Sequence, residues 1–181
     1  SPSLSARNST THGSVTSRTT HSFGSYCTHK PDEQPIAEFV REDKSILRLW
    51  IASSPGARAT KDTFDFIIDC GDIFSQWDMK KSTNILAGDS ELSAELQPYL
   101  SVVPAVRILQ IDWEDRTAPG VSPEFWTELN KRLYGDVMTC CVGGHGRSGT
   151  SFVSLLLNNA PDYDALDAIV HLRAVHCPRA I

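Results

Sequence analysis

The feature that most constrains this fold is a glycine-rich turn between an apolar run and a helix-forming run. The turn covers residues 141–150 and has the sequence Cys-Val-Gly-Gly-His-Gly-Arg-Ser-Gly-Thr. The apolar residues 137–140 precede it, and residues 151–157 continue it with helical character. A strand that leads through such a turn into a helix directs backbone N–H groups and the positive helix end at one point. The sequence therefore predicts an anion-binding loop with Cys141 at its start.

Composition divides the chain into a tail and one domain. Residues 1–26 contain eight serines and five threonines and almost no apolar side chains. Such a segment buries too little apolar surface to offset the entropy of ordering. We expect a disordered tail over residues 1–35 and a single domain over residues 36–181. The whole chain is 40% hydrophobic and 22% charged, which is typical of a globular protein.

Charge and cysteine content limit the partners and the compartment. The net charge is −5, so the chain has no general attraction to nucleic acid or to an anionic membrane. No apolar run approaches the roughly 20 residues that span a bilayer. The five cysteines are odd in number and match no disulfide scaffold. We therefore expect a cytoplasmic protein in a reducing environment, with no membrane span and no nucleic-acid partner; the oligomeric state stays open.

Strand and helix patterns alternate along the domain. We expect strands over residues 46–52, 64–70, 106–111 and 136–141, because each is a short run rich in apolar and β-branched residues. Helices are expected over residues 57–63, after the glycine-rich turn to about residue 159, and from residues 161–162 to Pro178. Residues 72–100 are less clear, with helical turns suggested near residues 73–77 and 91–100. This alternation predicts an α/β fold with a central, mostly parallel sheet flanked by helices.

Two of the expected helices have distinct patterns. In the first, Ser122 is the expected N-cap and Pro123 opens the first turn, and Gly135 is the expected end. Its buried stripe repeats every four residues, at Phe125, Leu129 and Leu133. For the final helix, the expected apolar face consists of Ala165, Leu166, Ile169, Val170 and Leu172. His171 and His176 do not share a face of this helix, so we do not expect a ligand pair there.

The residues of the turn are suited to attack on a phosphate ester. A cysteine beside backbone N–H donors, a helix N-terminus and an arginine is stabilised as the nucleophilic thiolate. Arg147 offers a planar fork to two phosphoryl oxygens, and Ser148 is placed to hydrogen-bond the sulfur as it leaves. The remaining loop residues are expected to bind phosphate through their backbone: Val142, Gly143, Gly144, His145 and Gly146. No metal or cofactor is required by this scheme.

The leaving oxygen needs a proton, and an acidic loop can supply it. Asp112, Glu114 and Asp115 follow the strand expected at residues 106–111. Because carboxyl ends of parallel strands meet at one sheet edge, this loop is expected beside Cys141. A carboxylic acid there donates the proton and then acts as a base toward water.

The turn has other possible interpretations. Gly144 and Gly149 have the spacing of a nucleotide-binding loop, but Thr150 stands where that loop requires lysine. His145 either lines the floor of the pocket or faces solvent. Cys140 alternates away from Cys141 on a strand, which indicates a small buried residue, with a redox partner of Cys141 as the alternative.

The motif Cys-x5-Arg-Ser resembles the signature of the cysteine-based protein tyrosine phosphatases. The upstream sequence Asp-Trp-Glu-Asp-Arg-Thr-Ala-Pro, residues 112–119, resembles the general-acid loop of the small dual-specificity branch, which includes the phosphatases of regenerating liver. The resemblance covers roughly residues 45–181. It implies a phosphatase fold, Cys141 as nucleophile, Arg147 as phosphate clamp and Asp115 as acid, with Asp112 in reserve. It also implies a phosphorylated protein as substrate, with phosphotyrosine as target and phosphoserine or phosphothreonine in addition.

Three differences from that family keep alternatives open. Cys140 replaces the histidine that usually precedes the nucleophile. The acid and the nucleophile, Asp115 and Cys141, are 26 positions apart, slightly fewer than expected. The sequence ends at Ile181, where the family continues into a further helix. A catalytically weak phosphate-binding module is one alternative, and the same chemistry on a phosphoinositide or an RNA 5′-phosphate is another.

Overall fold

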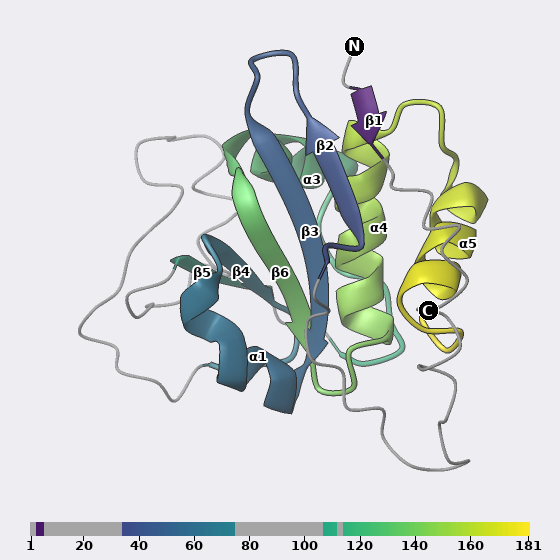
Figure 1. Cartoon of the computed structure of the whole chain (residues 1–181). Coiled ribbons are helices and arrows are strands. Elements are labelled where there is room, and N and C mark those ends of the chain that lie inside the picture. The colour runs from purple at the N-terminus through teal and green to yellow at the C-terminus, as the bar shows by residue number, and fades with distance from the viewer. Residues whose placement is uncertain (1–2, 6–33, 75–106, 112–113) are drawn as a thin grey trace.

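The computed structural model describes residues 3–5, 34–74, 107–111 and 114–181. Within these residues one sheet is flanked by helices (Figure 1). Its strands are β1 (Ser3–Ser5), β2 (Ala37–Val40), β3 (Ile46–Ser53), β4 (Phe66–Asp69), β5 (Arg107–Gln110) and β6 (Gly135–Cys141). The helices are α1 (Ser54–Thr60), the 3-10 turn η2 (Lys61–Thr63), α3 (Pro123–Arg132), α4 (Gly146–Asn159) and α5 (Ala165–Val175).

The sheet has the strand order β1-β2-β3-β6-β4-β5. The four strands from β3 to β5 run parallel, whereas β1 and β2 are added antiparallel at one side. The predicted α/β class with a mostly parallel sheet is therefore confirmed. The central strand β6 lies between β3 and β4, so its carboxyl end at Cys141 is flanked by two strand ends.

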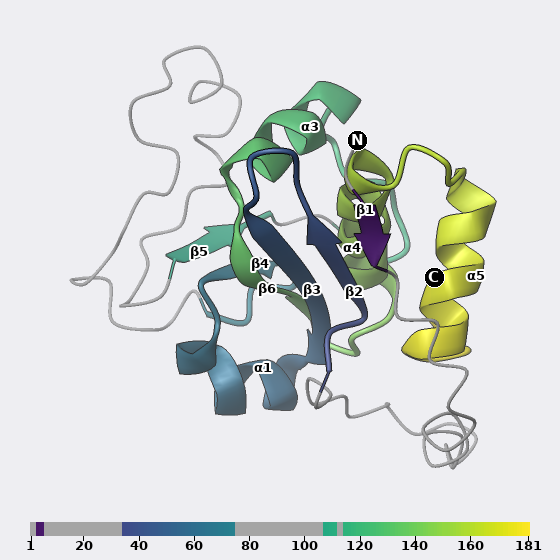
Figure 2. The ribbon, with the colours of Figure 1, turned by 45° about the horizontal axis from the view of Figure 1, so that its top comes forward.

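Both faces of the sheet are covered. One core includes Leu49, Ile68 and Cys141 of the sheet together with Phe125 of α3 and Phe152 of α4. A smaller core on α1 includes Ala57, Met138 and Cys140. Neighbouring residues of a strand point to opposite faces, so Cys140 and Cys141 belong to different cores. Helix α5 lies on the outer side of α4, away from the sheet (Figures 1 and 2).

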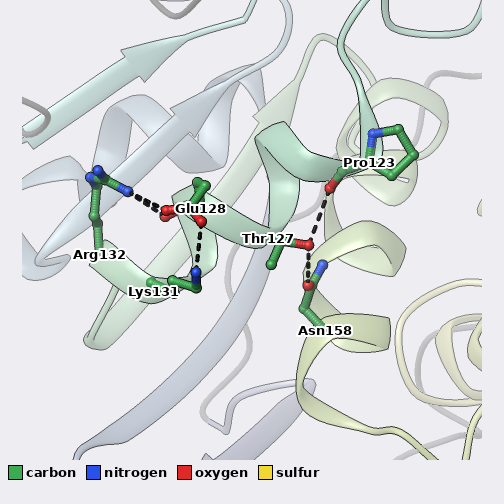
Figure 3. Close-up of polar contacts among 6 residues, drawn as sticks. All are labelled: Pro123, Thr127, Glu128, Lys131, Arg132 and Asn158. Atoms are coloured by element: carbon green, nitrogen blue, oxygen red, sulfur yellow. Dashed lines mark hydrogen bonds and ion pairs between the residues drawn. The ribbon is translucent and has the colours of Figure 1, made fainter. Parts of the chain in front are cut away.

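Helix α3 begins as the sequence predicts. The Ser122 side chain accepts a hydrogen bond from the Phe125 N–H at 3.2 Å. At the surface, α3 is joined to α4 by a hydrogen bond from the Thr127 hydroxyl to Asn158 Oδ1 at 2.9 Å (Figure 3). Glu128 pairs with Lys131 and Arg132 one turn later (Figure 3). The predicted stripe at Phe125, Leu129 and Leu133 is fully buried.

The predicted strands and the helix after the turn are confirmed, with ends that differ by one or two residues where they are described. Strand β3 continues one residue beyond the predicted 46–52, and β4 is shorter than the predicted 64–70. Helix α4 ends at Asn159, as predicted. Of the helical turn expected near residues 73–77, residues 73 and 74 are described and form a bend rather than a helix. The rest of that turn and the turn expected over residues 91–100 lie outside the described residues.

The first helix begins earlier than predicted. Helix α1 starts at Ser54, directly after β3, and not at Ala57. Pro55 occupies the first turn of the helix, where a backbone N–H would have no partner within the helix. The predicted end at Thr63 is correct, although the last three residues form the 3-10 turn.

Gly135 does not end α3 but opens β6. The helix ends at Arg132, and Leu133 is already extended. Gly135 has a φ of +68°, a backbone conformation that favours glycine. The predicted end of the helix was therefore three residues too late, because Gly135 is already the first residue of β6.

The final helix was predicted in the wrong phase. It begins at Ala165 and not at residues 161–162, because Asp164 provides its N-cap. Of the predicted face only Leu172 is buried, together with Ala168, which was not predicted. Leu166 and Val170 are 67% and 59% exposed. One helix face contacts α4, and these two residues lie on another.

A strand near the start of the domain was not predicted. Strand β2 pairs antiparallel with β3 through a tight turn at residues 41–45, in which Lys44 has a φ of +69°. The carboxylate of Asp43 accepts hydrogen bonds from the N–H and the hydroxyl of Ser45 and so fixes the turn. Strand β1 lies within the stretch predicted as a tail, of which residues 6–33 are outside the described residues. None of the described helices is both long and apolar enough to cross a bilayer.

Candidate active site

Cys141 occupies the carboxyl end of the central strand. Its backbone pairs in register with Ser53 of β3, and the neighbouring Cys140 pairs with Asp69 of β4. The side chain is buried, and its Sγ lies 3.2 Å from the hydroxyl of Ser148 in α4. This contact joins the first and last parts of the loop that connects β6 to α4. We refer to residues 141–148 as the phosphate loop, in keeping with the predicted chemistry.

The phosphate loop is closely enclosed by the ends of β3 and β4. Gly144 has a φ of +71°, and a Cβ at this position would lie 2.9 Å from the Ser53 nitrogen. On the other side, a Cβ on Gly71 would lie 3.1 Å from the Cys141 Cα. The Ser54 N–H donates to the Val142 carbonyl at 3.2 Å. Glycine is thus required at 144 by both conformation and space, and the path of the loop is fixed by its neighbours.

Helix α4 begins at the end of this loop. His145 is its N-cap residue but forms no side-chain cap hydrogen bond. The buried Ser148 is held from behind, because Thr139 of β6 donates from its hydroxyl to the Ser148 carbonyl at 3.1 Å. The positive end of α4 is therefore directed at the phosphate loop, and partial charges of this kind attract an anion.

Arg147 and Asp115 meet at the same place. Arg147 Nε lies 3.7 Å from Asp115 Oδ1, and the two side chains are 14% and 65% exposed. A short turn presents Asp115: the Thr117 N–H donates to the Glu114 carbonyl, and Asp115 Oδ1 accepts the Arg116 N–H at 3.1 Å. A carboxylate thus lies beside the guanidinium of Arg147 in the first turn of α4. The role of Asp115 as the acid stays a prediction. The reserve candidate Asp112 lies outside the described residues.

Comparison with known proteins places the fold among solved structures only. No family model matches the chain, and no curated protein matches it. Similar solved structures include Tk-PTP in its active form, at 19% identity over 75% of this chain and 82% of that chain, with a TM-score of 0.43. Human DUSP28 is 14% identical over 84% of this chain and 88% of its own, with a TM-score of 0.44. Kinase associated phosphatase is 17% identical over 76% and 79%, with a TM-score of 0.45. The chemistry of the site follows from its own geometry.

Two further cysteines, Cys70 and Cys140, lie close to the site. Burial raises the pKa of the Cys70 thiol, whose Sγ lies 3.0 Å from the Ser151 hydroxyl. Burial, and then the nearby Asp69 carboxylate, raise the pKa of the Cys140 thiol. Both therefore remain neutral thiols at neutral pH. Cys140 also lies in the core on α1, on the opposite face of the sheet from Cys141, as the strand alternation predicted.

Asp69 shapes the backbone next to Cys141. Its buried carboxylate accepts N–H bonds from Gly71, Ile73 and Phe74 at 2.8–3.1 Å. Burial raises the pKa of Asp69, and these N–H bonds oppose the rise. Three donors on one carboxylate fix the turn that brings Gly71 against Cys141.

The sequence reasoning missed two residues that contact the phosphate loop. The predicted position of His145 was open between the pocket floor and solvent; its Nε2 lies 3.3 Å from Cys177 Sγ. His176 Nε2 lies 2.8 Å from the Gly144 carbonyl oxygen. His176 and Cys177 follow α5, and no local pattern marks them, because only the packing of α5 on α4 brings them to the loop.

Proposed function

We propose that this chain hydrolyses phosphate monoesters of proteins through a phosphocysteine formed on Cys141. Phosphotyrosine is the main substrate, with phosphoserine and phosphothreonine in addition. The observation that carries the proposal is the grouping of Cys141, Arg147 and Asp115 around one loop at the start of α4. A nucleophile, an anion clamp and a proton donor are the three groups that transfer of a phosphoryl group to cysteine requires.

In the first step, the Cys141 thiolate attacks phosphorus as the bond to the ester oxygen breaks. The Arg147 guanidinium and the loop N–H groups stabilise the charge on the phosphoryl oxygens. Asp115, as the carboxylic acid, gives its proton to the departing alkoxide or phenoxide. The products are the alcohol or phenol and a phosphocysteine.

In the second step, water attacks the phosphorus and the sulfur–phosphorus bond breaks. The Asp115 carboxylate accepts a proton from the water, and inorganic phosphate leaves. The Ser148 hydroxyl, 3.2 Å from Cys141 Sγ, donates a hydrogen bond to the sulfur as it regains its negative charge. This contact supports a role for Ser148 in the breakdown of the phosphocysteine.

The contact between Asp115 and Arg147 supports an order in which the substrate binds first and Asp115 then gives its proton to the ester oxygen. A bound phosphoryl group competes with the Asp115 carboxylate for the same guanidinium, because both are anions that a guanidinium binds. Substrate binding would therefore release Asp115 from Arg147. Its exposed position leaves it free to approach the ester oxygen.

The direct test replaces the nucleophile. Cys141→Ser is expected to lower hydrolysis of para-nitrophenyl phosphate at pH 5–7 by at least about a thousandfold, because a serine hydroxyl is not ionised there. The matched control is Cys140→Ala, which changes the neighbouring buried cysteine on the other face and is expected to keep the activity. The wild-type enzyme, quenched in acid during turnover, is expected to carry one phosphoryl group on the peptide that contains Cys141.

The outcomes separate the alternatives. Undiminished turnover by Cys141→Ser would overturn the proposal. A wild-type chain that binds vanadate but hydrolyses no aryl phosphate would instead be a phosphate-binding module. A panel of phosphotyrosine and phosphothreonine peptides, phosphoinositides and RNA with a 5′-triphosphate then ranks the substrates by kcat/KM, and a preference for either of the last two would overturn the protein substrate.

A further inference from the structure

The turn that follows α5 contacts the phosphate loop from behind. Figure 1 shows the last turn of α5 at the same end of the molecule as the loop between β6 and α4. His176 and Cys177 of this turn are buried, at 3% and 0% exposure. They contact consecutive residues of the loop, Gly144 and His145. The two segments are far apart in sequence, so the contact is a property of the fold.

The chemistry of the His176 contact fixes its direction. A carbonyl oxygen only accepts, so His176 Nε2 carries the proton and donates it to the Gly144 oxygen at 2.8 Å. In a trans peptide the C=O and the N–H of the next residue point in opposite directions. The N–H of His145 is therefore directed away from α5. A hydrogen bond on the outer side of the loop thus sets the direction of a donor on its inner side.

Gly144 needs such an external restraint. Glycine has the most conformational freedom of any residue, and a φ of +71° is one of several conformations open to it. On one side there is no room for a side chain, because a Cβ on Gly144 would lie 2.9–3.2 Å from the backbone of Ala52 and Ser53 at the end of β3. On the other side its carbonyl is held by His176. The peptide between Gly144 and His145 is therefore restrained by two elements that do not belong to the phosphate loop.

We propose that His176 is a positioning residue of the phosphate loop, which holds the peptide between Gly144 and His145 so that its N–H serves the bound phosphoryl group. This inference rests on the proposed function, since it names a support for the same anion site. His176 acts through the loop, by its hydrogen bond to the Gly144 carbonyl and by the contact of its ring with that of His145, with 6.4 Å between the ring centroids. The contact of Cys177 with His145 belongs to the same support.

The test compares three replacements of His176. His176→Gln keeps an N–H donor near the position of Nε2, whereas His176→Asn is polar but too short to bring its amide there. His176→Leu is similar in size and has no donor. The matched control is His171→Leu, because His171 of α5 makes an equivalent contact with a carbonyl, that of Ile36 at 3.0 Å, away from the loop.

The readout is anion binding that does not depend on turnover. Vanadate is titrated against the rate at which iodoacetamide alkylates Cys141, and each variant is checked by its melting temperature. His176→Leu and His176→Asn are expected to raise the half-protecting vanadate concentration by about 10-fold to 100-fold, the effect of one lost hydrogen bond to an anion. His176→Gln is expected to stay within about threefold of wild type, and His171→Leu to leave protection unchanged.

The pattern across variants decides between positioning and stability. If His176→Asn, folded by its melting curve, protects Cys141 as well as wild type does, the proposal is wrong. It is equally wrong if His171→Leu weakens protection as much as His176→Leu. If the wild type is protected by vanadate but hydrolyses no aryl phosphate, the proposed function fails and the positioning role can still be measured. In an active enzyme the Leu variant should lower kcat/KM, and Gln should restore it.

Discussion

Helices α4 and α5 are neighbours, and their N-termini are capped in different ways. Helix α5 is capped by its own residues, which form a capping box: Asp164 accepts the Asp167 N–H at 2.8 Å, and the Asp167 side chain accepts the Asp164 N–H at 3.0 Å. At α4 the N-cap residue His145 makes no side-chain cap hydrogen bond. A carboxylate at this end of α4, that of Asp115, comes from another segment and pairs with Arg147 at 3.7 Å.

The difference lies in whether the anion is part of the helix. Both helix ends attract negative charge for the same reason, the sum of their peptide dipoles. At α5 a residue of the chain supplies that charge permanently, which stabilises the helix and leaves no vacancy for a ligand. At α4 the charge comes from the exposed side chain of Asp115, which under the proposed function a phosphoryl group displaces from Arg147. A helix N-terminus can bind an anionic ligand when no side chain of the helix itself supplies the negative charge.

The largest expected effect comes from Asp115. Asp115→Asn is expected to lower kcat for phenyl phosphate by about 10²-fold to 10⁴-fold, because the poor leaving group then departs without a proton. The loss should shrink with para-nitrophenyl phosphate, whose leaving group needs little protonation. Vanadate binding should be unchanged or tighter, because the competing carboxylate at Arg147 is removed.

Asp112→Asn is the control for this assignment. A small effect on phenyl phosphate is expected from it. If Asp112→Asn produces the larger loss, the acid is Asp112, and the contact of Asp115 with Arg147 has another role.

The next effect comes from making α4 resemble α5. His145→Asp places a permanent carboxylate at the N-cap, and His145→Asn places a neutral group of the same shape there. The carboxylate is expected to raise the inhibition constant of vanadate at least about tenfold above that of the Asn variant, through repulsion at close range. Equal constants for the two variants would show that the charge at this end of α4 does not govern binding.

The smallest effect is expected at α5. Asp164→Ala removes one half of the capping box and should lower the free energy of unfolding by about 1 kcal/mol, measured by urea denaturation. Hydrolysis of aryl phosphate should stay within about twofold of wild type at low urea. A loss of activity that exceeds the loss of stability would mean that the α5 start is coupled to the phosphate loop.

Much of the site could be predicted because its signals are local. The spacing of Cys141, Arg147 and Ser148 lies within one turn between a strand and a helix, and the glycines that allow the turn lie between them. The N-cap at Ser122 was predicted for the same reason, since the cap and its partner Phe125 are three residues apart. The position of Asp115 followed from one further rule, that the ends of parallel strands meet at one edge.

What could not be predicted depends on residues far apart in sequence. The apolar residues of α5 exceed what its contact with α4 can bury, so the sequence did not reveal that Leu166 and Val170 would be exposed. Strand β2 is only four residues long, and it is defined by its pairing with β3 rather than by its own pattern. The contact of His176 with Gly144 exists only after α5 has packed.

The central place of β6 has a consequence for the order in which the protein folds. Both partners of this strand, β3 and β4, precede it in the chain, and both pairings are parallel, so they join residues distant in sequence. Such pairings form late and slowly, because a long segment must be closed before either one forms. An emerging chain therefore cannot bring Cys141 to its place between the ends of β3 and β4 until both pairings have formed. On the proposed function, protection of Cys141 by vanadate reports that this stage of folding is complete.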